Sequence, residues 1–273
     1  MSASRPVLLA LVLVFVLAPR MAAPQGVAIT PEQMAVFLTK AAIVRERTTS
    51  DGITRPVRAT LSDGVLTHDA QFQTVDQARA VFEAGKASEV DFKDTYRYNI
   101  AGYRLAQMVG LETVPMSVER NYKGKSAAVT WWIDDAMMES DRKAKKLESQ
   151  DPEGWNKQMY AVRVFNQLIY NVDANLTNIL ITKDWNIWMI DHTRAFRLYR
   201  TCPKLAGMKQ IDRTLLENLK KLNKADLKSE LSQYLTPMEI DGVLARRDAI
   251  VKHFGVRMAE NGEAKVLYQM ASR

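Results

Sequence analysis

Three side chains that can offer oxygen ligands lie within one short segment, YNVDANLTNILITKDWNIWMIDHTRAF at residues 170–196. Asn178 follows Asp173 by five residues, and Asp191 follows it by eighteen. Two runs of β-branched and aromatic residues, ILIT and NIWMI, flank KDW and predict a hairpin that returns Asp191 to Asn178. The hard oxygens of the Asn178 and Asp191 side chains suit Mg²⁺ or Mn²⁺. Phosphoryl transfer needs such a metal and a carboxylate that orients the attacking hydroxyl, for which Asp173 is the candidate.

The same residues also have a purely structural interpretation. Asp173 would then form a turn, and Asn178 would cap the following strand. The third residue, Asp191, and its position between two short strands favour the chemical interpretation. For His192, a hydrogen bond inside a turn is the preferred role over a place in the metal site.

Residues 161–197 resemble the catalytic core of the protein-kinase-like superfamily. They are most similar to its atypical branches, which are the phosphatidylinositol kinases, the HipA-like toxin kinases and the secretory-pathway kinases. In those branches Asp-x4-Asn precedes a strand pair and an Ile-Asp metal site, as in this sequence. The segment NIAGYRLAQMVGLETVP resembles the helix that precedes their hinge strands, so that the resemblance covers roughly residues 57–197.

The resemblance implies a metal-dependent, ATP-using enzyme. Asp173 would be the catalytic residue, and Asn178 and Asp191 would hold Mg²⁺ or Mn²⁺. The adenine-contacting hinge would lie at Trp131–Ile133, which makes Trp132 a nucleotide contact. The acceptor, whether protein, lipid or small molecule, is not specified by the sequence.

Two positions depart from the kinase pattern. Kinases pair a strand lysine, which contacts the nucleotide phosphates, with a glutamate on the following helix. The matching positions here hold Gln73 and Asn99, which we expect to form a hydrogen bond and to line the nucleotide site. Since neither is charged, another residue would contact the phosphates, and the open candidates are Lys86, Lys93 and Arg97. No glycine-rich phosphate loop is present.

The remaining sequence predicts an α+β protein with two lobes and the kinase-like fold. Residues 24–135 would form a β-rich lobe with a preceding helix, 136–153 a charged, irregular connector, and 154–273 a helical lobe that carries the catalytic loop. The predicted elements are a helix that begins at Thr30, a hairpin at Asp63-Gly64, a helix over 95–109, a hairpin at Lys123-Gly124 and a third hairpin over 179–190.

The N-terminus has the pattern of an export signal. Arg5 precedes an apolar run from Val7 to Ala18, and small residues follow. Twelve residues rise about 18 Å as a helix, which is short of a ~30 Å hydrocarbon core. We therefore expect residues 1–23 to be a signal peptide, with an uncleaved membrane anchor at 7–18 as the alternative. The only glycosylation sequon, at Asn175, lies inside the predicted catalytic loop, which favours bacterial export to the periplasm or medium.

Composition limits the partners. The net charge of +7 over 273 residues is modest and its basic residues are scattered, so no nucleic acid partner is expected. The basic run at 142–146 lies among acidic residues and is interpreted as a solvated face. The leading hypothesis is an exported atypical kinase-like phosphotransferase. The alternatives are a pseudokinase that binds a nucleotide or protein, and a secreted structural or polyanion-binding protein.

Overall fold

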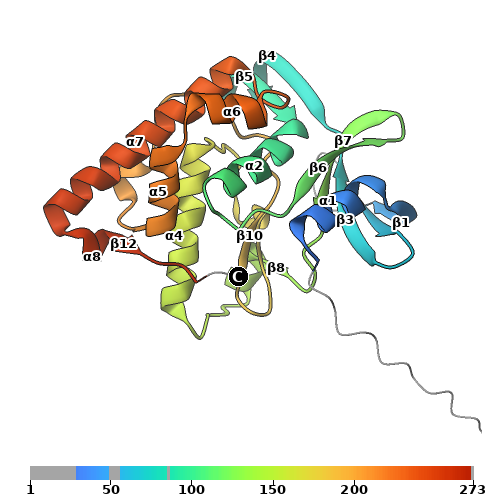
Figure 1. Ribbon diagram of the computed structural model, residues 1–273, viewed down its shortest axis with the longest axis horizontal. Coiled ribbons are helices and arrows are strands. Elements are labelled where there is room, and N and C mark those ends of the chain that lie inside the picture. Colours follow the sequence, from blue (N-terminus) through green and yellow to red (C-terminus); the bar gives the residue numbers. More distant parts are fainter. Residues whose placement is uncertain (1–28, 49–55, 85–86, 272–273) are drawn as a thin grey trace, which may run out of the picture.

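The chain folds into two lobes of different composition (Figure 1). The structure, a computed structural model, describes residues 29–48, 56–84 and 87–271. One lobe is built around an antiparallel sheet and the other mainly from helices. The predicted α+β class with two lobes is therefore confirmed.

The five-stranded sheet of the small lobe comes from two of the predicted hairpins and one further strand. All of its neighbouring strands are antiparallel, in the order β1-β2-β3-β7-β6. Both hairpins turn at the predicted glycines, because Gly64 and Gly124 have φ values of 89° and 80° that other residues rarely adopt. The strands are β1 (Ala42–Thr48), β2 (Val57–Ser62), β3 (Thr67–Gln73), β6 (Ser117–Tyr122) and β7 (Lys125–Trp131).

Two helices pack on the sheet through their own apolar residues. Helix α1 (Pro31–Lys40) begins with the predicted capping box of Thr30 and Gln33, and it packs on β6 and β7. Helix α2 (Arg97–Met108) buries Ile100 and Leu105 and lies between the sheet and the large lobe. Thus α2 contacts both lobes and connects the sheet to the elements that carry the site.

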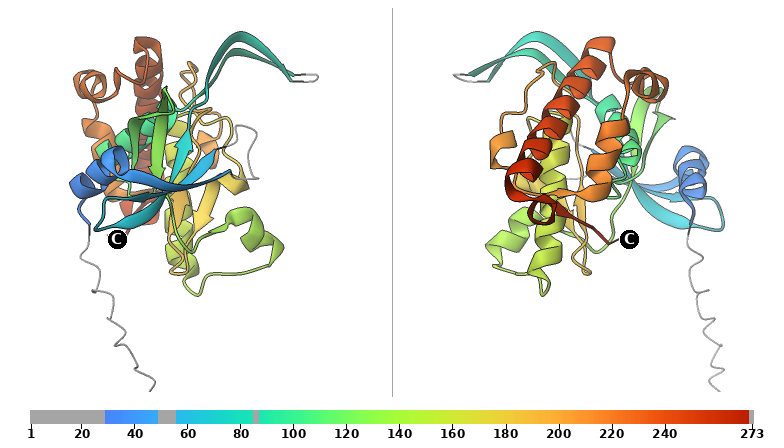
Figure 2. Two further views of the ribbon diagram at one scale, coloured as in Figure 1. Left: turned by 90° about the vertical axis from the view of Figure 1, so that its right-hand side faces the viewer. Right: turned by 60° about the vertical axis from the view of Figure 1, so that its left-hand side comes forward.

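A long hairpin that the sequence analysis did not predict precedes α2. Strands β4 (Asp76–Ala84) and β5 (Ala87–Thr95) pair only with each other and project from the body of the protein (Figure 2). The hairpin contacts the segment that follows Asp191: the Thr95 amide donates to the Thr193 carbonyl at 3.0 Å, and Glu89 forms ion pairs with Arg194 and Arg197.

The large lobe contains a small sheet beside its helices. Strands β10, β9 and β8 lie side by side in this order, and the β9–β10 hairpin falls where it was predicted. The elements are β8 (Met137–Met138), α3 (Glu139–Ala144), α4 (Pro152–Leu168), β9 (Ile179–Ile181), β10 (Ile187–Met189), β11 (Ile211–Asp212), α5 (Arg213–Lys221), α6 (Lys224–Leu231), α7 (Pro237–Asn261), α8 (Glu263–Val266), β12 (Leu267–Tyr268) and the 3-10 turns Leu176–Asn178 and Leu205–Gly207.

The segment 136–153 is more ordered than predicted. Met137 and Met138 pair with Ile181 and Leu180 as strand β8, and α3 follows directly. The charges of this segment predicted an irregular connector, but its two methionines complete the small sheet. Within it, Arg142 forms an ion pair with the buried Glu139.

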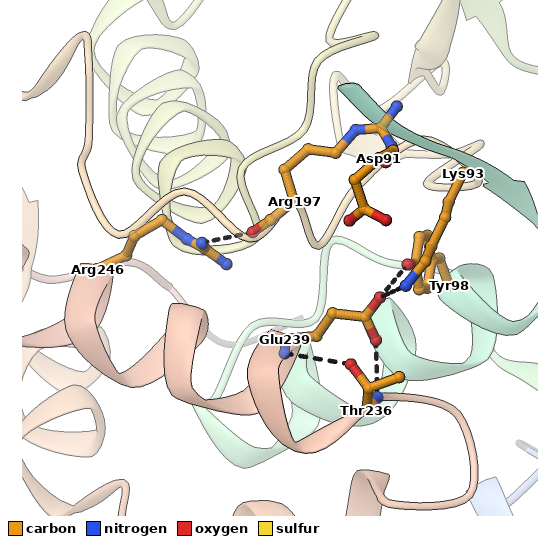
Figure 3. A network of polar contacts seen from close by, with 7 residues as sticks. All are labelled: Asp91, Lys93, Tyr98, Arg197, Thr236, Glu239 and Arg246. Atoms are coloured by element: carbon orange, nitrogen blue, oxygen red, sulfur yellow. Dashed lines mark hydrogen bonds and ion pairs between the residues drawn. The ribbon is translucent and has the colours of Figure 1, made fainter. Parts of the chain in front are cut away.

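A polar network connects the hairpin, α2 and α7 (Figure 3). The buried Glu239 carboxylate accepts from Lys93 and from the Tyr98 hydroxyl, each at 2.5 Å. Arg197 donates to the Asp91 carbonyl at 2.9 Å, and its own carbonyl accepts from Arg246 at 2.9 Å. These contacts attach strand β5 and the segment after Asp191 to the large lobe.

In the described part of the chain, no helix combines the length and the apolar character that crossing a membrane requires. The predicted signal peptide, residues 1–23, lies outside the described residues, and so does Lys86.

Candidate functional site

The loop between α4 and β9 holds Asp173 and Asn178 by local hydrogen bonds. The side-chain nitrogen Nδ2 of Asn178 donates to the backbone carbonyl of Asp173 at 3.0 Å, so a hydrogen bond joins the two residues of the Asp-x4-Asn spacing. The Asp173 amide donates to the Asn171 side chain at 3.0 Å, and Asn175 donates to one Asp173 carboxylate oxygen at the same distance. The Asn178 side-chain oxygen makes no hydrogen bond with any residue of the described ranges.

Asp191 follows β10 and lies beside this loop. The Ile190 amide donates to the Asn178 carbonyl at 3.0 Å, so the β9–β10 hairpin brings the neighbouring Asp191 back to Asn178. Asp191 has a φ of 56°, which is uncommon for a residue with a side chain. Asn178 and Asp191 line the same cavity. The two strand-forming runs on either side of KDW predicted that Asp191 returns to Asn178.

The electrostatic surroundings of Asp191 favour a cation. Its Oδ1 accepts from Gln73 at 3.3 Å and from the Thr193 hydroxyl at 3.0 Å. Burial nevertheless raises the pKa of its carboxyl above the usual range, and the charges of Asp94 and Asp173 raise it further. A divalent cation would compensate these like charges.

Gln73 and Asn99 form the hydrogen bond that was expected of them. The Asn99 amide nitrogen donates to the Gln73 side-chain oxygen, and the Asn99 oxygen accepts from the His192 backbone amide at 2.7 Å. Both side chains are buried. A chain of uncharged contacts therefore runs from α2 through β3 to Asp191.

The His192 ring is packed inside the protein rather than presented to the site. It is 2% exposed, and burial lowers its pKa to about 4. The ring lies against Gly102, where an added Cβ would be 3.2 Å from a ring carbon, and meets Phe165 edge-on. The ring is thus neutral at pH 7, and the hydrogen bond of this residue comes from its backbone.

The cavity beside Asn178 and Asp191 has a volume of about 830 Å³ and lies between the lobes. Trp132, which was predicted from the sequence to contact the nucleotide, lines this cavity. The acids on its walls outnumber the bases, since Arg58 is the only basic residue among the described residues that line it. The acids are Asp134, Asp135, Asp141 and Asp191.

Two of the three basic residues proposed from sequence to meet phosphates, Lys93 and Arg97, lie elsewhere. Lys93 is paired with Glu239, and Arg97 lies 3.6 Å from Asp76. Both line a second hollow, of about 430 Å³, between the β4–β5 hairpin and the loop before α7. Neither lines the cavity with Asp191, so a contact of Lys93 or Arg97 with phosphates in that cavity has no support among the described contacts.

Sequence reasoning missed Arg58 and Asp94. Arg58 lies opposite Gln71 in the β2–β3 register, so the predicted hairpin contained the signal that places it on the cavity. Asp94 lies at the base of the β4–β5 hairpin, next to the backbone contact with Thr193, and one of its oxygens is buried without a hydrogen-bond partner among the described residues. No pattern in the sequence predicted that hairpin.

The two lobes, the cavity between them and the placement of Asp173, Asn178 and Asp191 on either side of the β9–β10 hairpin are those of the protein-kinase-like fold in its atypical form. Solved structures with this fold include a hydra Fam20 with sugar (TM-score 0.66, 13% identity, 87% of this chain and 92% of that one). They also include a Golgi casein kinase (0.65, 13%, 88% and 80%) and the Helicobacter pylori proinflammatory kinase CtkA (0.51, 11%, 82% and 98%).

The structural similarity establishes the fold, and sequence identities this low do not establish the activity. Comparisons with models of protein families and with curated protein sequences find no match. The recognition of an atypical kinase-like fold from the sequence motif is confirmed by the structural neighbours.

Proposed function

We propose that the protein is an atypical kinase-like phosphotransferase that uses ATP with Mg²⁺ or Mn²⁺. The observation that carries the proposal is the backbone contact from Ile190 to Asn178, which puts Asn178 and Asp191 on one cavity next to Asp173. A Golgi casein kinase of the same fold has been crystallised with Mn/ADP bound, which supports a nucleotide and a divalent metal. The acceptor of the phosphoryl group is not assigned.

The residues of the site fit a hard divalent cation. Asn178 has an oxygen without a hydrogen bond to the described residues, and Asp191 contributes a carboxylate. Metal ions of this kind neutralise charge on the transferred phosphoryl group. The need is large here, because four aspartates and one arginine line the cavity and would repel a free triphosphate.

Asp173 is suited to orient an acceptor hydroxyl. Asn175 holds one of its carboxylate oxygens, and the Asn171 side chain fixes its backbone amide. The carboxylate is only partly buried, which leaves it accessible to an acceptor. Asp173 would accept the hydroxyl proton as the phosphoryl group is transferred.

The uncharged pair Gln73 and Asn99 favours a second candidate, a pseudokinase that binds nucleotide without transferring phosphate. The buried amides hold α2 against β3 and Asp191, as an ion pair would, yet bring no positive charge to a phosphate. Their direct contact with the nucleotide remains a proposal, as does that of Trp132. Export through residues 1–23 also belongs to the proposal for either candidate.

Transfer of the terminal phosphate of labelled ATP separates the two candidates. The chain from Pro24 onward would be incubated with Mg²⁺ or Mn²⁺ and with protein, lipid and small-molecule acceptors. We expect Asp173→Asn to bind nucleotide as the wild type does and to transfer phosphate 10²–10⁴-fold more slowly, on the scale typical of general-base removal.

Asp184→Asn is the matched control, because Asp184 is an exposed acid in the turn of the same β9–β10 hairpin. It should behave as the wild type. Nucleotide binding by the wild type without transfer to any acceptor or to water, unchanged by Asp173→Asn, would support the pseudokinase instead.

A further inference from the structure

Arg58 is fixed at the wall of the cavity by a carboxylate. Its Nε and Nη2 each lie 2.6 Å from one oxygen of Asp69, and the other Asp69 oxygen accepts from the Thr60 hydroxyl at 2.6 Å. The Arg58 side chain remains 31% exposed. The guanidinium is therefore held by one edge while part of it stays open to the cavity.

The same guanidinium covers the hinge tryptophan. Its central carbon lies 4.1 Å from the centre of the Trp132 ring. The Trp132 amide donates to the Asp69 carbonyl at 3.2 Å, so one residue, Asp69, positions both partners of the stack. The guanidinium and the indole both line the cavity, so a planar ligand in the cavity can contact this stacked pair.

We propose that Arg58 is the nucleobase-binding residue of the cavity and stacks its outer guanidinium face on the base. The inference rests on the proposed function and deepens it, because it assigns the two ends of the cavity. The base would lie at the hinge against Arg58 and Trp132, and the phosphates would lie near Asn178 and Asp191. Guanidinium groups stack readily on flat π systems, and their planar fork is already ordered here.

The alternative role for Arg58 is to bind phosphate, and the contacts argue against it. The ion pair with Asp69 already compensates the charge of Arg58, and Asp69 has a second contact with Thr60 that keeps it in place. Stacking needs the plane of the guanidinium and not its net charge. Gln71 pairs with Arg58 on one side and with Thr130 on the other in the sheet, and both Gln71 and Thr130 line the cavity. Their side chains can hydrogen-bond to the edge of a base.

Calorimetric titration of the chain from Pro24 onward with three probes tests this assignment. The probes are adenosine, which has no phosphate, Mg²⁺ with tripolyphosphate, which has no base, and Mg·ATP. Arg58→Lys retains the positive charge and loses the planar guanidinium. It should therefore weaken the affinity for adenosine and for Mg·ATP by about tenfold and leave the affinity for tripolyphosphate unchanged. Arg58→Met keeps the length without a π plane and should weaken adenosine binding in the same way. It replaces the lysine variant for the adenosine measurement if that one does not fold, because adenosine carries no charge that the loss of the arginine charge would affect.

The outcomes are distinguishable. Unchanged adenosine affinity in a folded Arg58 variant overturns the stacking role, and loss of tripolyphosphate with adenosine retained assigns Arg58 to phosphate instead. If the wild type binds Mg·ATP but both variants bind it equally well, only this inference fails. If the wild type binds none of the three probes, both the inference and the proposed function fail.

Discussion

At the scale of single residues, Asp191 shows how distant parts of the sequence converge on one carboxylate. Gln73 reaches it from β3 and Thr193 from its own loop, while Asp94 adds negative charge from the hairpin base. The motif spacing predicted the neighbourhood of Asp173, Asn178 and Asp191, because a two-strand hairpin leaves few other arrangements. Spacing could not predict Asp94, whose approach depends on a contact between segments far apart in the chain.

The pair Gln73 and Asn99 allows a test by replacement. Gln73→Lys combined with Asn99→Glu would place an ion pair between β3 and α2, with the cation beside Asp191. We expect Mg·ATP to bind more tightly, because the lysine adds positive charge near the phosphates. Asn99→Glu alone is the control, and it should lower stability because it buries a charge without a partner. Equal or weaker Mg·ATP binding by the folded double variant would contradict the strand register assigned to Gln73.

Cys202 reports on the packing behind the site. Burial raises the pKa of its thiol to about 11, and its Sγ lies 3.7 Å from the Arg246 carbonyl. Since only the thiolate reacts with iodoacetamide, alkylation of the folded protein at pH 8 should be about a hundredfold slower than after unfolding in urea. The rate should rise tenfold per pH unit up to about pH 11. A folded-state rate equal to the unfolded one would show that this thiol is exposed.

At the scale of elements, sequence reasoning succeeded where turn residues and apolar alternation agreed. The glycines at 64 and 124 and the capping box at Thr30 appear as predicted. The β4–β5 hairpin was missed because most of its side chains are exposed: Val81 and Val90 are more than half exposed, and few of its described residues, such as Phe92, are buried. A strand with so little buried surface carries a weak alternation of apolar and polar residues.

Arg246 on α7 is the polar residue that connects the elements behind the site. It is 0% exposed and donates to the carbonyls of Leu168 at 2.7 Å, Arg197 and Tyr199. Arg246→Leu would remove the donor to these buried carbonyls. We therefore expect the free energy of unfolding, measured in urea, to fall by at least about 3 kcal/mol. The control is Arg257→Leu, a partly buried position on the same helix whose side chain makes one hydrogen bond, to the Lys209 carbonyl. A loss below 1 kcal/mol for Arg246→Leu would contradict the buried placement.

At the scale of the whole molecule, α2 and the polar network around Glu239 connect the two lobes that form the cavity. The sequence predicted two lobes because strands dominate its first half and helices its second. It did not predict which cations lie on the cavity, because Lys93 and Arg97 are committed to acids of neighbouring elements. The ion-pair partners of long side chains depend on which elements lie next to each other in the fold, and the local sequence does not specify this.

The export hypothesis gives a prediction for the intact chain. After expression with its own N-terminus in a bacterium, the exported protein should begin near Pro24, because small residues at 22 and 23 follow the apolar run. N-terminal sequencing of the periplasmic fraction measures this. A soluble exported protein that retains Met1 would show that residues 1–23 are not removed.

The central claim is that Asp191 and Asn178 hold the metal that allows ATP to bind, and the melting temperature of the chain from Pro24 onward measures it. With Mg²⁺ and ATP at about 100 times the dissociation constant, the wild type should melt about 5 °C higher or more. ATP without metal should give no rise, because the aspartates of the cavity repel it. Asp191→Asn should lose the metal-dependent rise, while Asp173→Asn should keep it. A rise of equal size in Asp191→Asn, or in the wild type without metal, would contradict the account.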